Sequence, residues 1–301
     1  MKTKKSSLIR ESLPDRVFNV VNIVLMLLIL IIIIYPLYFI ILASFSTPET
    51  VASGQLLLWP KEFYLDGYKK IFEYEPIWTG YRNTIFYTIS GTAINLAVTI
   101  PAAYALSRRN LMGRSFLMLL FSFTMFFSGG MIPAYILVKN LNLLNTPWAM
   151  ILPGAASVWN IIVARTFMQQ NIPDELYDAS VIDGCNDFQF FFRIVLPLSK
   201  AIIAVMALFY AMGHWNNYFS ALIYLDNREL HPLQLIIRDL LIQNQIGFEM
   251  GSNITGIAER ARLAEQMKYG VIIISSLPMM LIYPFIQKSF EKGIMIGSLK
   301  G

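Results

Sequence analysis

The sequence has few charged residues, and long stretches of it have none. Asp, Glu, Lys and Arg make up 14% of the 301 residues, whereas 56% are hydrophobic. This composition is too apolar for an ordinary soluble domain. Six uncharged stretches are each long enough to cross a bilayer as a helix, which needs about 20 mostly apolar residues. They cover residues 17–48, 83–107, 115–138, 140–164, 201–225 and 269–287.

Cysteine and histidine are almost absent. Cys185 is the only cysteine, so a disulfide within the chain is excluded, and the two histidines, His214 and His231, do not have metal-ligand spacing. The phosphate-binding motifs G-x-x-x-x-G-K-[ST] and G-x-G-x-x-G are also missing. We therefore expect no metal and no cofactor on this chain. If ATP hydrolysis drives its function, the ATPase is another chain.

Ionisable residues are missing from the centres of the six stretches. Such residues are usual in proton relays and voltage sensors, so their absence argues against a proton-coupled transporter. Neutral polar groups beside aromatic rings suit an uncharged, hydroxyl-rich solute such as a sugar, but the same groups also hold helices together. The candidates for a solute pathway are Ser128, Gly129, Asn160, Tyr210, His214, Trp215, Asn216, Asn217 and Tyr218.

Positive charges in the short loops predict the orientation. Residues 1–16 hold five basic residues and residues 107–114 hold three, whereas the loop after the third stretch holds only Lys139. By the positive-inside rule, both termini are then cytoplasmic. We predict an all-α membrane protein with six transmembrane helices, in which a cytoplasmic segment (1–16) precedes one membrane domain (17–290) and a cytoplasmic tail (291–301). The net charge of +5 fits this rule and gives no reason to expect nucleic acid.

The outer segments of the predicted topology are residues 45–82 and 226–268. Several Pro and Gly residues in the first segment predict turns and short helices. In the second segment, apolar residues at helical spacing over 233–242 predict a helix that lies at the outer membrane surface or packs on a partner.

Residues 169–197 form an acidic cytoplasmic loop between the fourth and fifth stretches. Pro173 fits a first helical position, Gly184 fits the left-handed residue that ends a helix, and Asn186 with Gln189 resembles a capping box. We expect two helices joined by a tight turn, with a nearly bare surface at Ala179 and Ser180 that a partner can approach closely. This is the shape of a docking element.

The spacing in this loop resembles the EAA motif, E-A-A-x3-G-x9-I-x-L-P, of the membrane subunits of ATP-binding-cassette importers. The matching residues are Asp178-Ala179-Ser180, Gly184 and Ile194-Val195-Leu196-Pro197. The segments "HWNNYFSALIYL" and "YPFIQKSFEKGIMIGSLKG" are similar to those of maltose-type and complex-saccharide or lipoprotein-type permeases. The chain departs from the usual pattern in Asp178, which replaces Glu, in Ser180, which replaces the second Ala, and in Cys185, which stands where Ala is usual.

The resemblance implies a permease subunit that forms half of the translocation pathway for an oligosaccharide or another sugar. Its implied partners are a homologous second permease subunit, two ATPase subunits that hold ATP and Mg²⁺, and an extracytoplasmic solute-binding protein, all at the cytoplasmic (inner) membrane. The acidic loop would seat in a groove on the ATPase, with the C-terminal tail as a second contact. The coupling residues are then Glu175, Asp178, Ala179, Ser180, Asp183, Gly184 and Lys300.

Two other functions stay open. A permease of the same superfamily for phosphate, an amino acid or a peptide would favour a complementary charge within the spans. An enzyme embedded in the membrane would need a catalytic pair, and His214 is the one candidate base within a span, with no partner identifiable by spacing.

Overall fold

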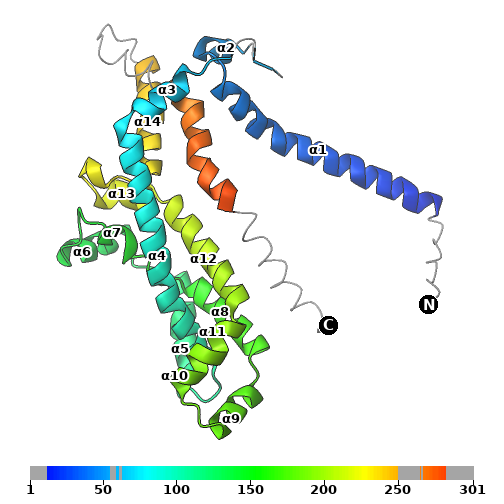
Figure 1. The fold of residues 1–301 in the computed structure, drawn as a ribbon, viewed down its shortest axis with the longest axis vertical. Coiled ribbons are helices and arrows are strands. Elements are labelled where there is room, and N and C mark those ends of the chain that lie inside the picture. The colour runs from blue at the N-terminus through cyan, green and yellow to red at the C-terminus, as the bar shows by residue number, and fades with distance from the viewer. Residues whose placement is uncertain (1–11, 55–58, 61–62, 250–264, 266, 283–301) are drawn as a thin grey trace.

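The computed structural model describes residues 12–54, 59–60, 63–249, 265 and 267–282. Over these residues the chain is helical and contains no strand, which confirms the predicted all-α class. Most of the helices pack into an elongated body, and one long helix, α1 (Leu13–Ser44), extends away from it (Figure 1).

The other described helices follow in chain order. They are α2 (Pro48–Ala52), α3 (Asp66–Glu73), α4 (Glu75–Ser107), α5 (Arg114–Phe126), α6 (Met131–Asn140), α7 (Trp148–Ile151), α8 (Val158–Asn171), α9 (Asp174–Ile182), α10 (Asp187–Phe190), the π-helix η1 (Phe191–Val195), α11 (Leu196–Leu198), α12 (Lys200–Trp215), α13 (Phe219–Tyr224), the 3₁₀-helix η2 (Arg228–Leu230), α14 (Leu233–Glu249) and a last helix, Met267–Ile282.

Helix α1 is exposed over most of its length. It begins at an N-cap, Ser12, whose hydroxyl accepts a hydrogen bond from the backbone N–H of Asp15, and it contains Pro36. Its C-terminal end alone is buried, where Leu42 and Ala43 pack near Tyr269. An apolar helix of this length needs lipid or another chain around it, because soluble surfaces do not carry such areas of exposed hydrocarbon.

Helix α4 is the centre of the body. It packs against α8, α12 and α14, and it runs from α3 at one end of the body toward α9 and α10 at the other (Figure 1). Its 33 residues correspond to about 50 Å at the rise of an α-helix. The short helices expected in residues 45–82 are confirmed, although α4 already begins at Glu75, before the uncharged stretch starts.

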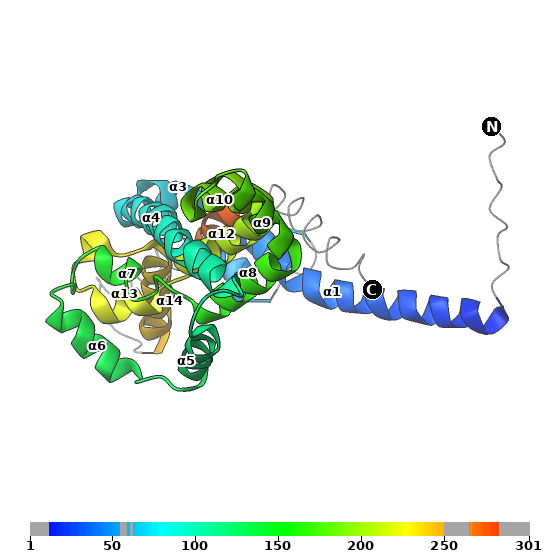
Figure 2. The same ribbon diagram turned by 90° about the horizontal axis from the view of Figure 1, so that it is seen from below.

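Three of the uncharged stretches contain a break rather than one continuous helix. Helices α5 and α6 are bent by 110° at Gly129-Gly130, where Gly130 has a φ of +84°. The fourth stretch is divided between α7 and α8 around Pro153-Gly154, and the fifth is divided between α12 and α13. By length and composition, α1 and α4 qualify as membrane-spanning helices, or up to four spans are present if each bent pair counts as one. Seen from below, α5 and α6 lie at the edge of the body (Figure 2).

One row of α4 holds its neighbours through polar groups and one glycine. The row steps by four residues, which follows a ridge on a helix surface, and every member is buried. We call it the α4 stripe, and it consists of Asn83, Tyr87, Gly91, Asn95 and Thr99.

The upper part of the α4 stripe holds η2. The side-chain amide of Asn83 donates to the carbonyl oxygens of Glu229 and His231, at 2.6 and 3.1 Å. The Tyr87 hydroxyl donates to the carbonyl of Leu230 at 2.8 Å. Because η2 is a single turn, the carbonyl groups at its end lie beyond its own backbone hydrogen bonds, and the α4 side chains satisfy polar groups that would otherwise be costly to bury.

The lower part of the α4 stripe holds α12. Asn95 donates to the carbonyls of Gly154 (2.6 Å) and Ala155 (2.9 Å), while its amide oxygen lies 2.7 Å from Nε2 of His214. Gly91 makes this approach possible, since a β-carbon there would clash with the His214 ring. Asn95 therefore joins α4, the α7–α8 connection and α12 in one hydrogen-bonded group.

Helix α14 confirms the helix expected over residues 233–242 but not its environment. Leu233, Ile236 and Leu240 are buried against Ile71 and Ile77 of the same chain. The backbone N–H of Leu233 also donates to the Thr84 hydroxyl of α4. The expectation that this apolar face lies on the membrane surface or on a partner is therefore wrong, because the sequence pattern shows an apolar face without showing what covers it.

We predict that Asn95→Ala destabilises the body by about 2 kcal/mol or more, because two buried carbonyls and His214 lose their partner. The apparent melting temperature of the purified protein should fall. Thr166→Ala is the matched control, since the Thr166 hydroxyl is exposed and bonds only to Ile162, one turn away in its own helix. Equal melting of the two variants would contradict the role given to Asn95.

Candidate functional site

The first helix of the acidic loop, α9, is built as the sequence predicts, with one change at its start. Pro173 is the N-cap residue rather than the first helical residue, and Asp174 and Glu175 occupy the first turn. The helix ends in a Schellman motif: the N–H groups of Gly184 and Cys185 donate to the carbonyls of Val181 and Ser180. Gly184 has a φ of +80°, the left-handed conformation that favours glycine.

The second helix, α10, begins at the predicted capping box. The Asn186 side chain accepts from the N–H of Gln189 at 2.8 Å, and the Gln189 side chain accepts from the N–H of Asn186 at 3.0 Å. A π-helix follows at Phe191–Val195, a conformation that often marks functional sites. The segment Asp187–Leu198 then turns by 77° into α12.

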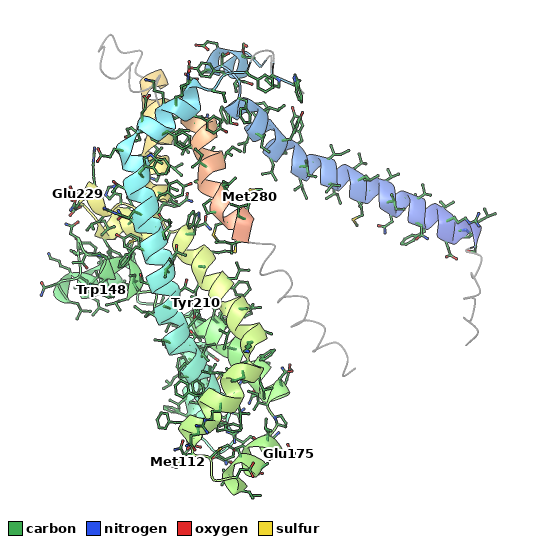
Figure 3. All side chains as sticks on the ribbon, viewed as in Figure 1. Met112, Trp148, Glu175, Tyr210, Glu229 and Met280 are labelled. Atoms are coloured by element: carbon green, nitrogen blue, oxygen red, sulfur yellow. The ribbon has the colours of Figure 1, made fainter. Side chains whose placement is uncertain are left out.

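The two helices form the tip of the body at the end away from α3 (Figure 1). The same end carries Met112 and Glu175 in Figure 3, so the arginine-rich loop and the acidic loop lie together, as the predicted topology requires. The predicted coupling residues that α9 and its turn leave exposed are Glu175, Asp178, Ala179, Asp183 and Gly184. Lys300 and the tail over 291–301 lie outside the described residues.

Ser180 is the exception among the predicted docking residues. Its side chain is 4% exposed, and its hydroxyl donates to the carbonyl of Tyr177. The expectation that Ala179 and Ser180 together form a bare surface is therefore wrong for Ser180, because successive helix residues point in directions about 100° apart. A small side chain is needed there to pack the loop within its own chain.

Exposed apolar side chains at the tip were missed by the sequence reasoning. Ile182 and Phe188, on either side of Gly184, are 87% and 77% exposed. The signal was available, since large apolar residues in a polar loop beyond the membrane predict a contact surface.

Arg108 also belongs to this site. It follows α4 directly, and its guanidinium lies 4.2 Å from the ring centre of Tyr177 and 3.5 Å from the Asp174 carboxylate. Tyr177 donates a hydrogen bond to Asp187, which raises the pKa of the phenol. The sequence reasoning used Arg108 only as a positive charge for orientation.

The predicted pathway residues fall into two groups. Tyr210, His214 and Trp215 use their polar atoms within this chain: Tyr210 shares a hydrogen bond of 2.6 Å with Thr99, and the Trp215 indole donates to the carbonyl of Ser275. His214 bonds to Asn95, as described above. These contacts make the three residues part of the helix packing in this chain.

The remaining candidates do not share these hydrogen bonds to other helices. Ser128, Gly129, Asn216 and Tyr218 are exposed, and Asn217 accepts a hydrogen bond from the N–H of Ser220 at the start of α13. Asn160 is buried in the first turn of α8, one helical turn from its N-cap Ser157. Contact of these residues with a solute stays a prediction. Trp215 lines a cavity of about 570 Å³ between α4, α12 and the last helix, whose walls are almost entirely apolar.

Residues 76–296 match the family of inner membrane components of binding-protein-dependent transport systems, and the chain belongs to this family. It is 43% identical over 287 residues to Protein LplC of Bacillus subtilis (strain 168), covering 95% of this chain and 96% of that protein. It is 41% identical over 290 residues to the polygalacturonan/rhamnogalacturonan transport system permease protein YtcP of the same organism, covering 96% and 100%.

A more distant relative and a solved structure agree with this family. The arabinooligosaccharides transport system permease protein AraQ of Halalkalibacterium halodurans is 29% identical over 89% of this chain and 91% of its own length. A crystal structure of a bacterial ABC transporter involved in the import of the acidic polysaccharide alginate matches with a TM-score of 0.84 and 30% identity, over 93% of this chain and 99% of that one. The resemblance to sugar permeases seen in the sequence is thereby confirmed.

We predict different effects for substitutions at two neighbouring residues of α9. Ser180→Leu should destabilise the loop by about 1–3 kcal/mol, because a larger side chain has to enter a filled site. Hydrogen exchange of the α9 amides should then become faster. Ala179→Leu is the control of equal added volume at an exposed position, and it should leave the exchange of the same amides unchanged. Faster exchange in both variants would contradict the burial that separates them.

Proposed function

We propose that this chain is the permease subunit of an ATP-driven importer and forms half of the translocation pathway for an oligosaccharide. The observation that carries the proposal is a rigid, exposed element of two capped helices at one end of a body of membrane helices. Such an element can transmit the movement of a partner, because its turn is held by a Schellman motif and a capping box. The chain itself has no catalytic role, and ATP and Mg²⁺ are held by separate ATPase subunits.

The family and its relatives support a saccharide as the solute. Two relatives carry names that refer to polygalacturonan or rhamnogalacturonan and to arabinooligosaccharides, and the matching solved structure concerns the import of alginate. These solutes share a chain of sugar rings and differ in charge. The uncharged centres of the six stretches favour a neutral saccharide, whereas the alginate importer handles an acidic polysaccharide, so neutral and acidic saccharides are distinguished by experiment.

Exposed apolar surfaces support a second membrane subunit. None of the most apolar part of α1 is buried in this chain, and α5 has no buried residue. Phe126 and Ile132, beside the bend between α5 and α6, are 82% and 69% exposed. A homologous second permease subunit and the lipid bilayer would cover these surfaces. An extracytoplasmic solute-binding protein completes the proposed complex.

The proposed topology has six spans in the cytoplasmic (inner) membrane, with both termini on the cytoplasmic side. Each broken stretch then counts as one span, and breaks of this kind are tolerated in membranes where they are packed on protein or line a pathway. The charge distribution of the short loops supports the orientation.

The saccharide is identified through the solute-binding protein. The purified binding protein encoded beside this chain should bind oligogalacturonides or arabinooligosaccharides and should not bind amino acids or phosphate. Uptake of the same saccharide by the reconstituted complex should require ATP. Binding of an amino acid or phosphate instead would replace the saccharide in the proposal while leaving the permease role in place.

We predict that Gly184→Trp abolishes ATP-driven uptake without unfolding the chain. Apart from its two chain neighbours, no atom of the described residues lies within 4 Å of a β-carbon at this position, so the side chain has room there, and the left-handed backbone adds about 1 kcal/mol. A bulky group at this exposed turn would collide with a docked partner. The measurement is uptake and ATP hydrolysis by the reconstituted complex.

Gly184→Asn is the matched control for Gly184→Trp. Asn tolerates the left-handed conformation and adds little volume, so this variant should retain most of the uptake. Normal uptake by Gly184→Trp would show that the turn is not the coupling element.

We predict that single cysteines at Lys4, Arg109 and Asp187 resist a membrane-impermeant thiol reagent added from outside, in a Cys185→Ala background. A cysteine at Glu73, whose side chain is 69% exposed beside the outer end of α4, should react. Labelling is measured on intact cells, and permeabilised cells provide the control that the first three positions are accessible. Labelling of Asp187→Cys from outside would contradict both the topology and the docking of the acidic loop.

A further inference from the structure

The cytoplasmic end of α4 is joined to both helices of the acidic loop by one side chain. Arg108 is the C-cap residue of α4, and its side chain is only 14% exposed. The guanidinium carbon lies 4.2 Å from the ring centre of Tyr177 in α9 and 5.7 Å from that of Phe190 in α10. One terminal nitrogen lies 3.5 Å from the Asp174 carboxylate in the first turn of α9.

The two rings form a fixed seat for the guanidinium. Tyr177 and Phe190 pack edge to face, with centres 5.2 Å apart and planes at 85°. Phe190 is fully buried in the main core, together with Ile100 and Ala103 of α4. A planar guanidinium can lie over a ring and still bond a carboxylate, which an ammonium group does less well.

Arg108 connects helices that the chain does not connect. Helix α8 leads into α9 through Ile172 and Pro173, and α10 leads into α12 through η1 and α11. The backbone therefore joins α8 and α12 directly to the loop. Helix α4 is remote in sequence from α9, and it carries the stripe that holds η2, the α7–α8 connection and α12. Tyr104 of α4 contacts Phe190 of α10 and Phe191 of η1. The contact between α4 and the Tyr177 ring of α9 comes from Arg108, and the charge contacts to Asp174 come from Arg108 and from the exposed Arg109.

We propose that Arg108 is the positioning residue that makes α4 follow α9 when the ATPase moves the acidic loop. The inference rests on the proposed function, since it assigns the route by which movement of the loop reaches the helices of the pathway. Arg108 does not touch the ATPase or the solute in this role. It acts through Tyr177, Phe190 and Asp174, and it locks the end of α4 to the loop.

Arg109 provides a matched control within the same site. Its Nε lies 3.2 Å from the other oxygen of the same Asp174 carboxylate, but its side chain is 82% exposed. An exposed ion pair contributes little. Arg108→Ala and Arg109→Ala therefore each remove one positive charge from beside the same carboxylate. Only Arg108→Ala also removes a guanidinium from the seat formed by the two rings.

The experiment measures whether α4 and α9 move together. Spin labels are placed at Val98→Cys on α4 and Val181→Cys on α9, in a Cys185→Ala background, and every variant is built on this labelled parent. The complete transporter is reconstituted, and distances are measured by pulsed electron resonance without nucleotide and with ATP and vanadate. Uptake of oligogalacturonides or arabinooligosaccharides is measured per ATP hydrolysed.

The labelled parent and Arg108→Ala should differ both in the distance between the labels and in uptake per ATP. The parent and Arg109→Ala should keep one narrow distance in both states. Arg108→Ala should show a distance that shifts or broadens with ATP and vanadate, and uptake per ATP should fall by about tenfold, because the cation and its ring contacts are lost together. Arg108→Lys should lie between these, since it keeps a cation without the planar group.

Several results would overturn the inference. One is an unchanged distance and normal uptake per ATP in Arg108→Ala, and another is an equal loss in Arg109→Ala, which would assign the effect to charge alone. If Arg108→Ala does not assemble, Arg108→Lys decides, and parent-like distances and uptake in that variant overturn the inference. Failure of the proposed function is seen separately, as a parent complex without an associated ATPase or without saccharide uptake.

Discussion

The Asn95 amide is the interaction on which the arrangement of the body depends. It satisfies two carbonyl groups in the α7–α8 connection, where Pro153-Gly154 interrupts the helix, and it bonds to His214 of α12. A break of this kind inside a membrane leaves carbonyl groups without partners, and each is costly in hydrocarbon. One amide on α4 therefore makes the break tolerable and fixes its position beside two other helices.

The other members of the α4 stripe also hold neighbouring elements against α4. Asn83 and Tyr87 bond to the carbonyl groups around η2, Gly91 gives room to His214, and Thr99 bonds to Tyr210. In a bilayer the hydrophobic effect does not drive helices together, so close packing and hydrogen bonds between helices carry the association. This explains why a helix of neutral polar and small residues, rather than the most apolar helix, lies at the centre. The most apolar helix, α1, stands outside.

The sequence predicted the acidic loop in detail and the packing of the spans only in outline. The loop was predictable because its shape is set by local rules: a proline, a left-handed glycine and a capping box each act within a few residues. The burial of Ser180, the contacts that Arg108 makes with α9 and α10, and the packing of α14 are set by contacts between distant parts of the chain. The members of the α4 stripe recur every four residues in the sequence, but the groups to which they bond are known only from the structure.

The geometry also separates residues that hold helices together from residues that could contact a solute, which the sequence could not distinguish. Tyr210, His214 and Trp215 were candidates for contact with a solute, but their polar atoms are engaged in holding α12 to α4 and to the last helix. A group that bonds a neighbouring helix is exchanged for a solute only at the cost of that bond. Ser128 is an exposed candidate, and Asn216, also exposed, donates to the Met212 carbonyl of its own helix rather than to a neighbouring helix. A solute pathway formed with a second subunit would therefore draw on the bends of the broken stretches, while the polar groups of the body hold α4, α8 and α12 together.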